Sequence, residues 1–100
     1  MNKKNFLCLL FVLLAFVMNA KDYNVIDFGA IGDGNTKNTV YLQLAIDRCA
    51  EEGGGRVIIP SGVYVTGTIF LKSHVNLHLE QNAELSGSKD LDDYPNLAKD

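Results

Sequence analysis

The protein has 100 residues, nine of them Lys or Arg and twelve Asp or Glu, which gives a net charge of −3. Hydrophobic residues make up 47% of the chain, and its nine glycines and two prolines are scattered. This is the composition of a globular protein, and it excludes a collagen-like or low-complexity chain. The acidic balance also excludes a nucleic-acid-binding protein, because neutralising phosphates requires a surplus of Lys and Arg.

The first twenty residues differ in composition from the rest of the chain. Lys3 and Lys4 precede an unbroken apolar run from Phe6 to Met18, and the small residue Ala20 follows. As a helix this run would extend about 20 Å, less than the roughly 30 Å of a hydrocarbon core. The pattern predicts a secretory signal peptide cleaved after Ala20, with a short membrane anchor as the alternative. We therefore expect a secreted or periplasmic protein without stable membrane insertion.

Residues 21–100 contain a single cysteine, Cys49. A lone thiol forms no internal disulfide, so no disulfide framework stabilises this exported segment. Eighty residues bury only a marginal core without such a staple or a partner. We expect Cys49 to be a buried, inert thiol rather than a nucleophile, because it lies on the apolar face of a predicted helix.

The first elements after residue 20 are predicted from their hydrophobic period. Residues 24–28 predict a short strand, and residues 29–37 form a glycine-rich turn. A helix follows, with Asn38 or Thr39 as its N-cap, and it ends at glycines 53–55. Its apolar stripe consists of Leu42, Ala45, Ile46 and Cys49. The helix should therefore cover an apolar surface with one face only.

The rest of the chain alternates like short strands. Four strands are predicted, at residues 56–59, 63–66, 68–72 and 75–80. Asn82 predicts a turn, apolar spacing continues at Leu85, and the polar tail from residue 89 to residue 100 predicts a loop. Gaps of a few residues between the strands are too short to hold further helices.

Short strands joined by short turns are typical of a solenoid in which strands of successive rungs pair in parallel. We predict a mainly β fold in which the N-terminal amphipathic helix caps the first rungs of a parallel β-helix that is incomplete in this chain. Residues 1–20 would be the signal peptide, and residues 21–100 the cap and first rungs. The open end would expose apolar interior, so we expect the isolated chain to be poorly stable.

The glycine-rich turn at residues 29–36 has the location of a phosphate-binding loop, between a strand and a helix. However, a P-loop needs lysine after its last glycine, and Asn35 takes that place here. Asp33 would also repel phosphate, and together with Ile31 it breaks the dinucleotide fingerprint. We interpret these glycines as residues that supply positive φ angles in a tight turn.

The two histidines, His74 and His78, have the spacing of a helical zinc pair. On a strand their side chains would lie about 13 Å apart, too far to share one ion. His78 and Glu80 would lie closer, about 6.6 Å apart on one face. We expect all three to be solvent-facing positions of a sheet rather than metal ligands or catalytic groups.

Asp92 and Asp93 form an adjacent pair of carboxylates in an acidic loop. Paired carboxylates perform acid–base chemistry when the fold sets their separation and drives their pKa values apart. Because charged residues beside Lys89 and Asp90 indicate a solvated loop, we expect no catalytic role for this pair. The residues themselves thus indicate no catalytic, cofactor-binding or metal site.

From Tyr23 to Pro95 the sequence resembles the start of a glycoside hydrolase of family 28, the polygalacturonase family. Three of the motifs that carry the resemblance are shared across the wider pectin-lyase-like superfamily: residues 27–34 (DFGAIGDG), 45–49 (AIDRC) and 53–57 (GGGRV). A closer resemblance, to the narrower polygalacturonase-type pattern, is found at residues 60–64 (PSGVY), 66–73 (TGTIFLKS), 77–80 (LHLE) and 87–88 (GS), followed by 93–95 (DYP).

The resemblance implies a right-handed β-helix and an enzyme that hydrolyses α-linked galacturonic acid in pectin or a related rhamnogalacturonan. Such enzymes invert the anomeric centre with an aspartic acid and other aspartates that activate water. The family's Asn-Thr-Asp, Gly-His-Gly and Arg-Ile-Lys motifs do not occur here. Asp92 and Asp93 precede Tyr94 and Pro95 in an N-terminal loop and are not the family's catalytic Asp-Asp pair. The aspartates would lie beyond this chain, which we expect to be inactive by itself.

Two alternatives share the implied superfamily. The first is a Ca²⁺-dependent polysaccharide lyase, which needs acidic metal ligands and a basic residue that abstracts a proton. The second is a non-catalytic binding solenoid, similar to a tailspike, without paired inward-facing aspartates. For the hydrolase we expect a pectin-type polysaccharide as the partner and no cofactor.

Overall fold

The computed structural model describes residues 21–95. The predicted signal peptide and residues 96–100 of the predicted tail lie outside these residues. Six strands are described: β1 (Asp22–Asn24), β2 (Asp33–Lys37), β3 (Gly55–Ile59), β4 (Gly62–Thr66), β5 (Val75–Leu79) and β6 (Ala83–Gly87). The helices are α2 (Thr39–Glu51) and two 3-10 helices, η1 (Val25–Phe28) and η2 (Leu91–Asp93).

The strands form two sheets in which all pairs are parallel. Their orders are β1-β3-β5 and β2-β4-β6, so the chain alternates between the sheets as it advances. In the register of the sheets, Gly55 lies beside Val75 and Gly62 lies beside Ala83. Residues that pair on adjacent strands are therefore about 20 residues apart in the sequence. A mainly β fold with parallel strands is thus confirmed. Short turns join β3 to β4 and β5 to β6, whereas the other connections are longer.

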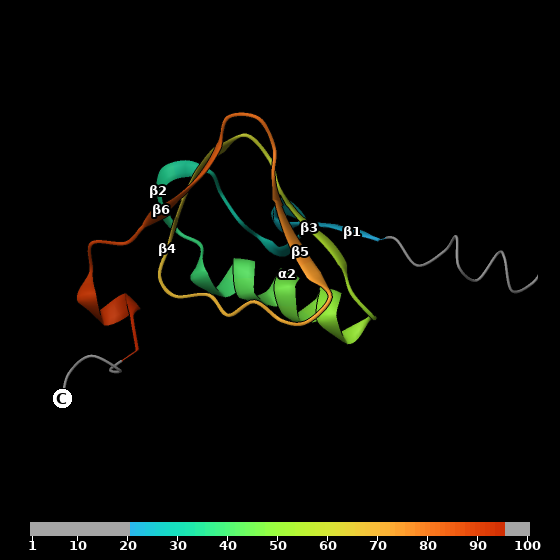
Figure 1. Ribbon diagram of the computed structural model, residues 1–100. Helices are drawn as coiled ribbons and strands as arrows, with labels where there is room; N and C mark the ends of the chain where they lie inside the picture. Colours follow the sequence, from blue (N-terminus) through green and yellow to red (C-terminus); the bar gives the residue numbers. More distant parts are fainter. Residues whose placement is uncertain (1–20, 96–100) are drawn as a thin grey trace, which may run out of the picture.

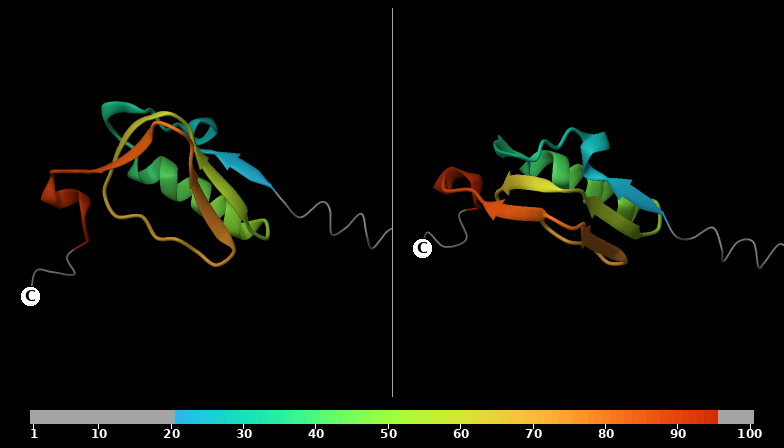
Figure 2. Two further views of the ribbon diagram at one scale, coloured as in Figure 1. Left: turned by 45° about the horizontal axis from the view of Figure 1, so that its top comes forward. Right: turned by 90° about the horizontal axis from the view of Figure 1, so that it is seen from above.

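The two sheets and α2 enclose a three-sided space. Figure 1 shows the sheets as two sides of a triangle, with α2 along the third side. The segment between β4 and β5, residues 67–74, runs along the same side as α2 in Figures 1 and 2. The described chain therefore occupies the third side first with a helix and then with an irregular segment.

The hydrophobic core fills this space. The predicted helical stripe is confirmed, because its four residues are the buried residues of α2. They form one cluster with buried residues of η1 and the strands, namely Val25, Val57, Ile59 and Tyr64. Helix α2 packs on η1, β1 and β3. Among residues 21–95, no helix has the length and apolar character needed to cross a membrane.

The start of the chain differs from the prediction in two places. The strand predicted at residues 24–28 is wrong: β1 ends at Asn24 and η1 follows. The Asn24 side chain accepts a hydrogen bond from the Ile26 N–H, which turns the backbone out of the extended conformation. The predicted turn at 29–37 is also too long, since its second half is strand β2, which pairs with β4.

The strand predicted at residues 68–72 is wrong as well. These residues include β-branched and aromatic side chains, but no strand lies beside them among the described residues. Instead, the Gln43 side chain of α2 bonds the backbone of Phe70. The predicted tail loop contains the short helix η2, and the turn at Asn82 is confirmed by its positive φ of 67°.

Asn38 occupies the N-cap position of α2, which confirms one of the two predicted residues. Its side chain, however, makes no cap hydrogen bond. The fully buried Asn38 amide instead bonds the N–H and C=O of Ile31 and the C=O of Thr36. The Thr39 hydroxyl accepts from the N–H of Gly67. Both side chains are therefore used to join segments that the chain brings together, because buried polar groups require partners.

Adjacent glycines provide a matched test of the close packing at the end of α2. Gly53 and Gly54 both have φ of 102°, but a Cβ would meet nothing at Gly53 and would lie 2.6 Å from the His74 carbonyl oxygen at Gly54. We expect Gly53→Ala to cost about 1–2 kcal/mol of strain and Gly54→Ala to cost roughly 1–3 kcal/mol more. Urea unfolding of the full-length protein measures both, and equal losses would contradict this packing.

Candidate functional site

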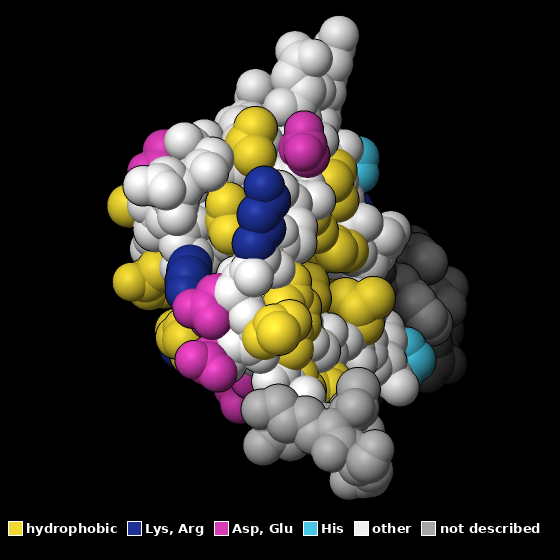
Figure 3. Space-filling model, turned by 90° about the vertical axis from the view of Figure 1, so that its left-hand side faces the viewer, with side chains coloured by type: hydrophobic (Ala, Val, Ile, Leu, Met, Phe, Trp, Pro, Cys, Tyr) yellow, Lys and Arg dark blue, Asp and Glu magenta, His cyan; other side chains and the backbone are white. Residues whose placement is uncertain are grey.

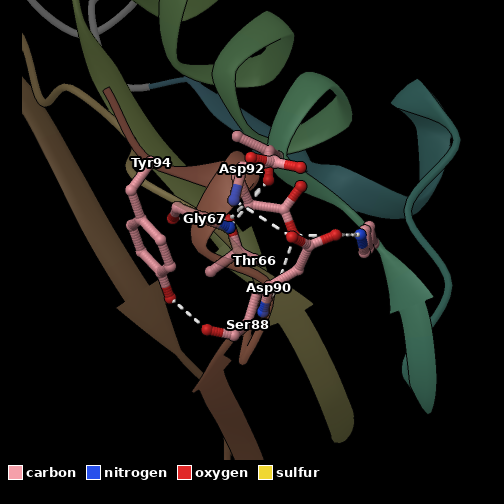
Figure 4. A network of polar contacts seen from close by, with 9 residues as sticks. Thr66, Gly67, Ser88, Asp90, Asp92 and Tyr94 are labelled. Carbon is pink, nitrogen blue, oxygen red and sulfur yellow. Dashed lines mark hydrogen bonds and ion pairs between the residues drawn. The ribbon is translucent and has the colours of Figure 1, made fainter. Parts of the chain in front are cut away.

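The densest polar cluster of the described residues lies where the chain leaves β6. We call it the Ser88 cluster, and it consists of Lys37, Ser88, Asp90, Asp93 and Tyr94. Lys37 is the last residue of β2, Ser88 directly follows β6, and the other three lie in or beside η2. Figure 4 shows Tyr94 reaching back to Ser88, next to Thr66 and Gly67 at the end of β4. The cluster therefore joins two segments that are far apart in the sequence, the end of β2 and residues 88–94.

Lys37 bridges two carboxylates in this cluster. Its Nζ lies 2.9 Å from Asp90 Oδ2 and 3.1 Å from Asp93 Oδ2. The Ser88 hydroxyl donates to Asp93 and accepts from the Asp90 N–H at 3.1 Å. The Tyr94 hydroxyl donates to the Ser88 carbonyl oxygen at 2.6 Å. Each carboxylate thus already has a cationic and a neutral donor.

The charges of the cluster shift the pKa values of its members. The hydrogen bond from Lys37 is the main reason that the pKa of Asp90 is below its ordinary value of 3.8. The hydrogen bonds to Asp90 and Asp93 in turn raise the pKa of Lys37 above 10.5. Both groups therefore stay charged near neutral pH. A general acid needs the opposite shift, so the ion pairs of Lys37 support a structural role for Asp90.

The structure separates the two predicted acidic residues. Asp92 is exposed, as expected of a solvated loop, whereas the Asp93 side chain is only 21% exposed and bonded as described. The expectation of a solvated loop is wrong for Asp93, because Ser88 and Lys37 draw its carboxylate inward. Sequence reasoning missed Lys37 altogether, since 53 residues separate it from Asp90. The face that carries the cluster shows acidic and basic side chains beside hydrophobic ones (Figure 3).

The glycine-rich turn folds as a corner between strands. Gly29 and Gly34 have φ of 108° and 75°, which confirms the interpretation of positive φ at these two positions. The Asp33 carboxylate accepts hydrogen bonds from Asn35 N–H and from the N–H and hydroxyl of Thr36. These bonds lower the pKa of Asp33. A carboxylate thus occupies the backbone donors that a phosphate would need.

The histidines lie outside any shared site. His78 is an exposed residue of β5, which confirms its predicted place on a strand, and Glu80 directly follows that strand. His74 is exposed but precedes the strand, with a positive φ of 66°, so its predicted sheet position is wrong. No group of three or more potential metal ligands occurs among residues 21–95. Cys49 is fully buried as predicted, and burial raises its pKa, which disfavours the reactive thiolate.

The Ser88 cluster predicts how the tail depends on pH. Because the pKa of Asp90 is lowered, its stabilisation is complete above pH 3.8 and is lost as the pH falls through its folded pKa. The raised pKa of Lys37 makes its contribution complete below pH 10.5, with loss as the pH rises further. We expect amides 88–94 to be protected between these limits and Lys37→Met to reduce that protection at neutral pH.

Hydrogen-exchange mass spectrometry of the full-length protein, corrected for intrinsic exchange rates, measures this protection. Lys89→Met is the matched control, because Lys89 makes no ion pair among the described residues. Equal protection in the Lys37 and Lys89 variants would show that the cluster does not hold the tail.

Comparison with known proteins identifies the family. A family model described as rhamnogalacturonase A/epimerase, pectate lyase-like, matches residues 23–86. The exo-poly-α-D-galacturonosidase of Dickeya chrysanthemi is 46% identical over 79 residues, 79% of this chain and 13% of that protein. The structure of the family 28 exopolygalacturonase of Yersinia enterocolitica matches with a TM-score of 0.72 and 50% identity, over 76% of this chain and 13% of that chain.

A relative with a different name matches the same part of the chain. Plasmin and fibronectin-binding protein A of Streptococcus pneumoniae is 38% identical over 76 residues, 74% of this chain and 11% of that protein. This chain therefore spans 11–13% of the length of these relatives. The resemblance predicted from the motifs is confirmed: the chain belongs to the rhamnogalacturonase A/epimerase, pectate lyase-like family.

Proposed function

We propose that this chain is the N-terminal part of a glycoside hydrolase that cleaves α-galacturonosidic bonds in pectin or a related rhamnogalacturonan. The observation that carries the proposal is the identity of 46% with an exo-poly-α-D-galacturonosidase across most of the described residues. The polygalacturonase-type segments identified in the sequence include residues with structural roles here, among them Gly67, Ser88 and Tyr94. These segments therefore contribute contacts that shape the fold of this chain.

The same proposal includes a β-helix whose first rungs are formed by residues 21–95. Parallel pairing at a repeat of about 20 residues supports it, because a solenoid stacks equivalent strands in this way. Helix α2 would cap the first rung, which its buried stripe and its packing on η1, β1 and β3 support. In this arrangement β5 and β6 receive the next rung along edges that have no partner among residues 21–95.

In the proposed mechanism the reaction inverts the anomeric centre. One aspartic acid protonates the leaving oxygen, and other aspartates activate a water on the opposite face of the sugar. This requires carboxyl groups about 6.5–9.5 Å apart, leaving room for the water. The family's Asn-Thr-Asp, Gly-His-Gly and Arg-Ile-Lys motifs do not occur in this sequence. The Asp92-Asp93 pair of this chain, which is not the family's catalytic pair, lies in the segment of the Ser88 cluster. The catalytic aspartates would belong to rungs of the full-length protein beyond this chain.

A non-catalytic binding solenoid is the second candidate. The match to a plasmin and fibronectin-binding protein supports it, since this part of the fold occurs in proteins named for binding as well as for hydrolysis. A lyase of the same family is the third, supported by the pectate lyase-like description of the family model. The three candidates differ in the products that they release from polysaccharide.

Incubation of the full-length protein with polygalacturonate, and separately with rhamnogalacturonan, distinguishes the candidates. We expect new reducing ends of inverted configuration by NMR and no unsaturated sugar, because hydrolysis adds water across the bond. Unsaturated products absorbing ultraviolet light would instead indicate a lyase, and binding without cleavage would indicate a binding solenoid. The chain of residues 21–100 is the control, and we expect it to be inactive.

We also propose that the protein is exported and that its first twenty residues are a signal peptide. The support is the sequence pattern of two lysines, a short apolar run and Ala20. We expect the exported protein to begin at Lys21, which N-terminal sequencing of material from the periplasm or the medium checks. Retention of Met1 on a membrane-bound product would identify the segment as an anchor.

A further inference from the structure

The backbone of Lys21 is tied to the start of β3. Lys21 directly follows the proposed cleavage site, so its nitrogen atom belongs to the peptide bond that would be cut. Its carbonyl oxygen accepts a hydrogen bond from the Arg56 N–H at 2.8 Å. A Cβ at Gly55 would overlap this oxygen and would lie 3.4 Å from the Lys21 nitrogen. The residue directly after the proposed cleavage site is therefore part of the folded structure.

Side-chain contacts hold the same part of the chain. The Arg56 guanidinium donates two hydrogen bonds of 2.9 Å to the Asp22 carboxylate, which lowers the pKa of Asp22. The Tyr23 hydroxyl donates to Glu52 Oε1 at 2.6 Å, and this bond raises the pKa of Tyr23 to about 12. The same oxygen lies 3.9 Å from Lys21 Nζ. Each of the first three described residues thus has a partner at the end of α2 or in β3.

These contacts lie on the side of β3 that faces away from any further rung. The strand order is β1-β3-β5, so a further rung would join this sheet at β5 and leave the pairing of β1 with β3 as it is. A peptidase has to enclose the bond that it cuts, so backbone hydrogen bonds beside that bond must open first. The fold therefore controls access to the proposed cleavage site.

We propose that docking of β1 on β3 closes the peptide bond between Ala20 and Lys21 to signal peptidase, so that processing has to precede folding of the first rung. The inference rests on the proposed signal peptide. Arg56 follows Asp22 by 34 residues, which at usual rates of synthesis take about 2–7 s to make. Cleavage within this time meets a site whose partners are absent, whereas later cleavage requires β1 to leave the sheet.

Cell-free synthesis of the full-length precursor tests the order of the two events. Signal peptidase in detergent is either present from the start or added later, once hydrogen exchange shows that amides 22–24 are protected. We expect complete cleavage after Ala20 in the first case and cleavage at least about tenfold slower in the second, because several hydrogen bonds must open together. Equal rates would overturn this inference and leave the signal peptide in place. No cleavage in either case would overturn the signal peptide and this inference with it.

A pair of arginine variants tests whether β1 itself controls the late cleavage. Arg56→Met removes the ion pair with Asp22 and leaves the sequence around the cleaved bond unchanged. Arg48→Met is the matched control, because Arg48 makes no ion pair among the described residues. We expect late cleavage to be about two- to fivefold faster in Arg56→Met, the effect of losing one exposed ion pair, and unchanged in Arg48→Met. Equal late rates in the two variants would contradict control by β1.

Two glycines provide a second, independent comparison. Gly55→Ala places a Cβ against the Lys21 carbonyl oxygen, whereas Gly53→Ala has a positive φ as well but meets nothing within 4 Å. We expect the first variant to be cleaved faster than the second after folding, and both to be cleaved completely during synthesis. Equal late rates here would again count against the inference. No readout depends on hydrolysis of a polysaccharide, so the proposed enzymatic function is tested separately.

Discussion

Parallel pairing of β3 and β4 with their neighbours is the constraint on which the rest of this structure depends. Each of these strands is the centre of a three-stranded sheet. Parallel strands require the chain to return to the same end of the sheet before it pairs again. Here that return takes about 20 residues, set by the alignment of Gly55 with Val75 and Gly62 with Ala83. Each connection from β2 or β4 back to the other sheet must therefore span the third side of the molecule and arrive in register.

Two different connections satisfy this constraint side by side. The first is α2, whose 13 residues extend about 20 Å at 1.5 Å per residue. The second is the segment between β4 and β5, whose eight residues, 67–74, can reach about 26 Å when extended and so are long enough to follow the helix. The helix covers the core with one face and holds the segment with another. The helix contributes apolar burial through Ile46 and backbone partners through Gln43.

Function in this family depends on what is built on such a framework. An exo-poly-α-D-galacturonosidase and a plasmin and fibronectin-binding protein both match this chain at 38–46% identity. The polar groups that the matching segments bring together here, such as Lys37 with Asp93, stabilise a turn of the chain. Catalysis by inversion would need carboxyl groups with room for water between them, and Lys37 fills that room in the Ser88 cluster. The polar contacts of this cluster are therefore best understood as structural ones.

Local pattern was enough to predict the elements whose residues are neighbours in the chain. The stripe through Leu42 and Cys49 gave α2 its buried face, because helical period and burial follow from sequence spacing alone. The alternation at residues 75–80 predicted β5, which ends at Leu79, for the same reason. The family, too, was evident from contiguous motifs such as the glycine-rich turn, and the family match confirms it.

Tertiary contacts decided the remaining features, since each involves a partner distant in the sequence. Residues 68–72 have strand-forming side chains, yet Gln43 supplies the backbone partners and no strand results. Asn38 is a residue type typical of a capping side chain, yet its amide forms hydrogen bonds with the backbone of Ile31. Asp93 lies in a segment typical of a solvated loop, yet its carboxylate forms an ion pair with Lys37 of β2. Hydrophobic spacing along the chain determines which face is buried, whereas the partner of a polar group depends on which segments the parallel register brings together.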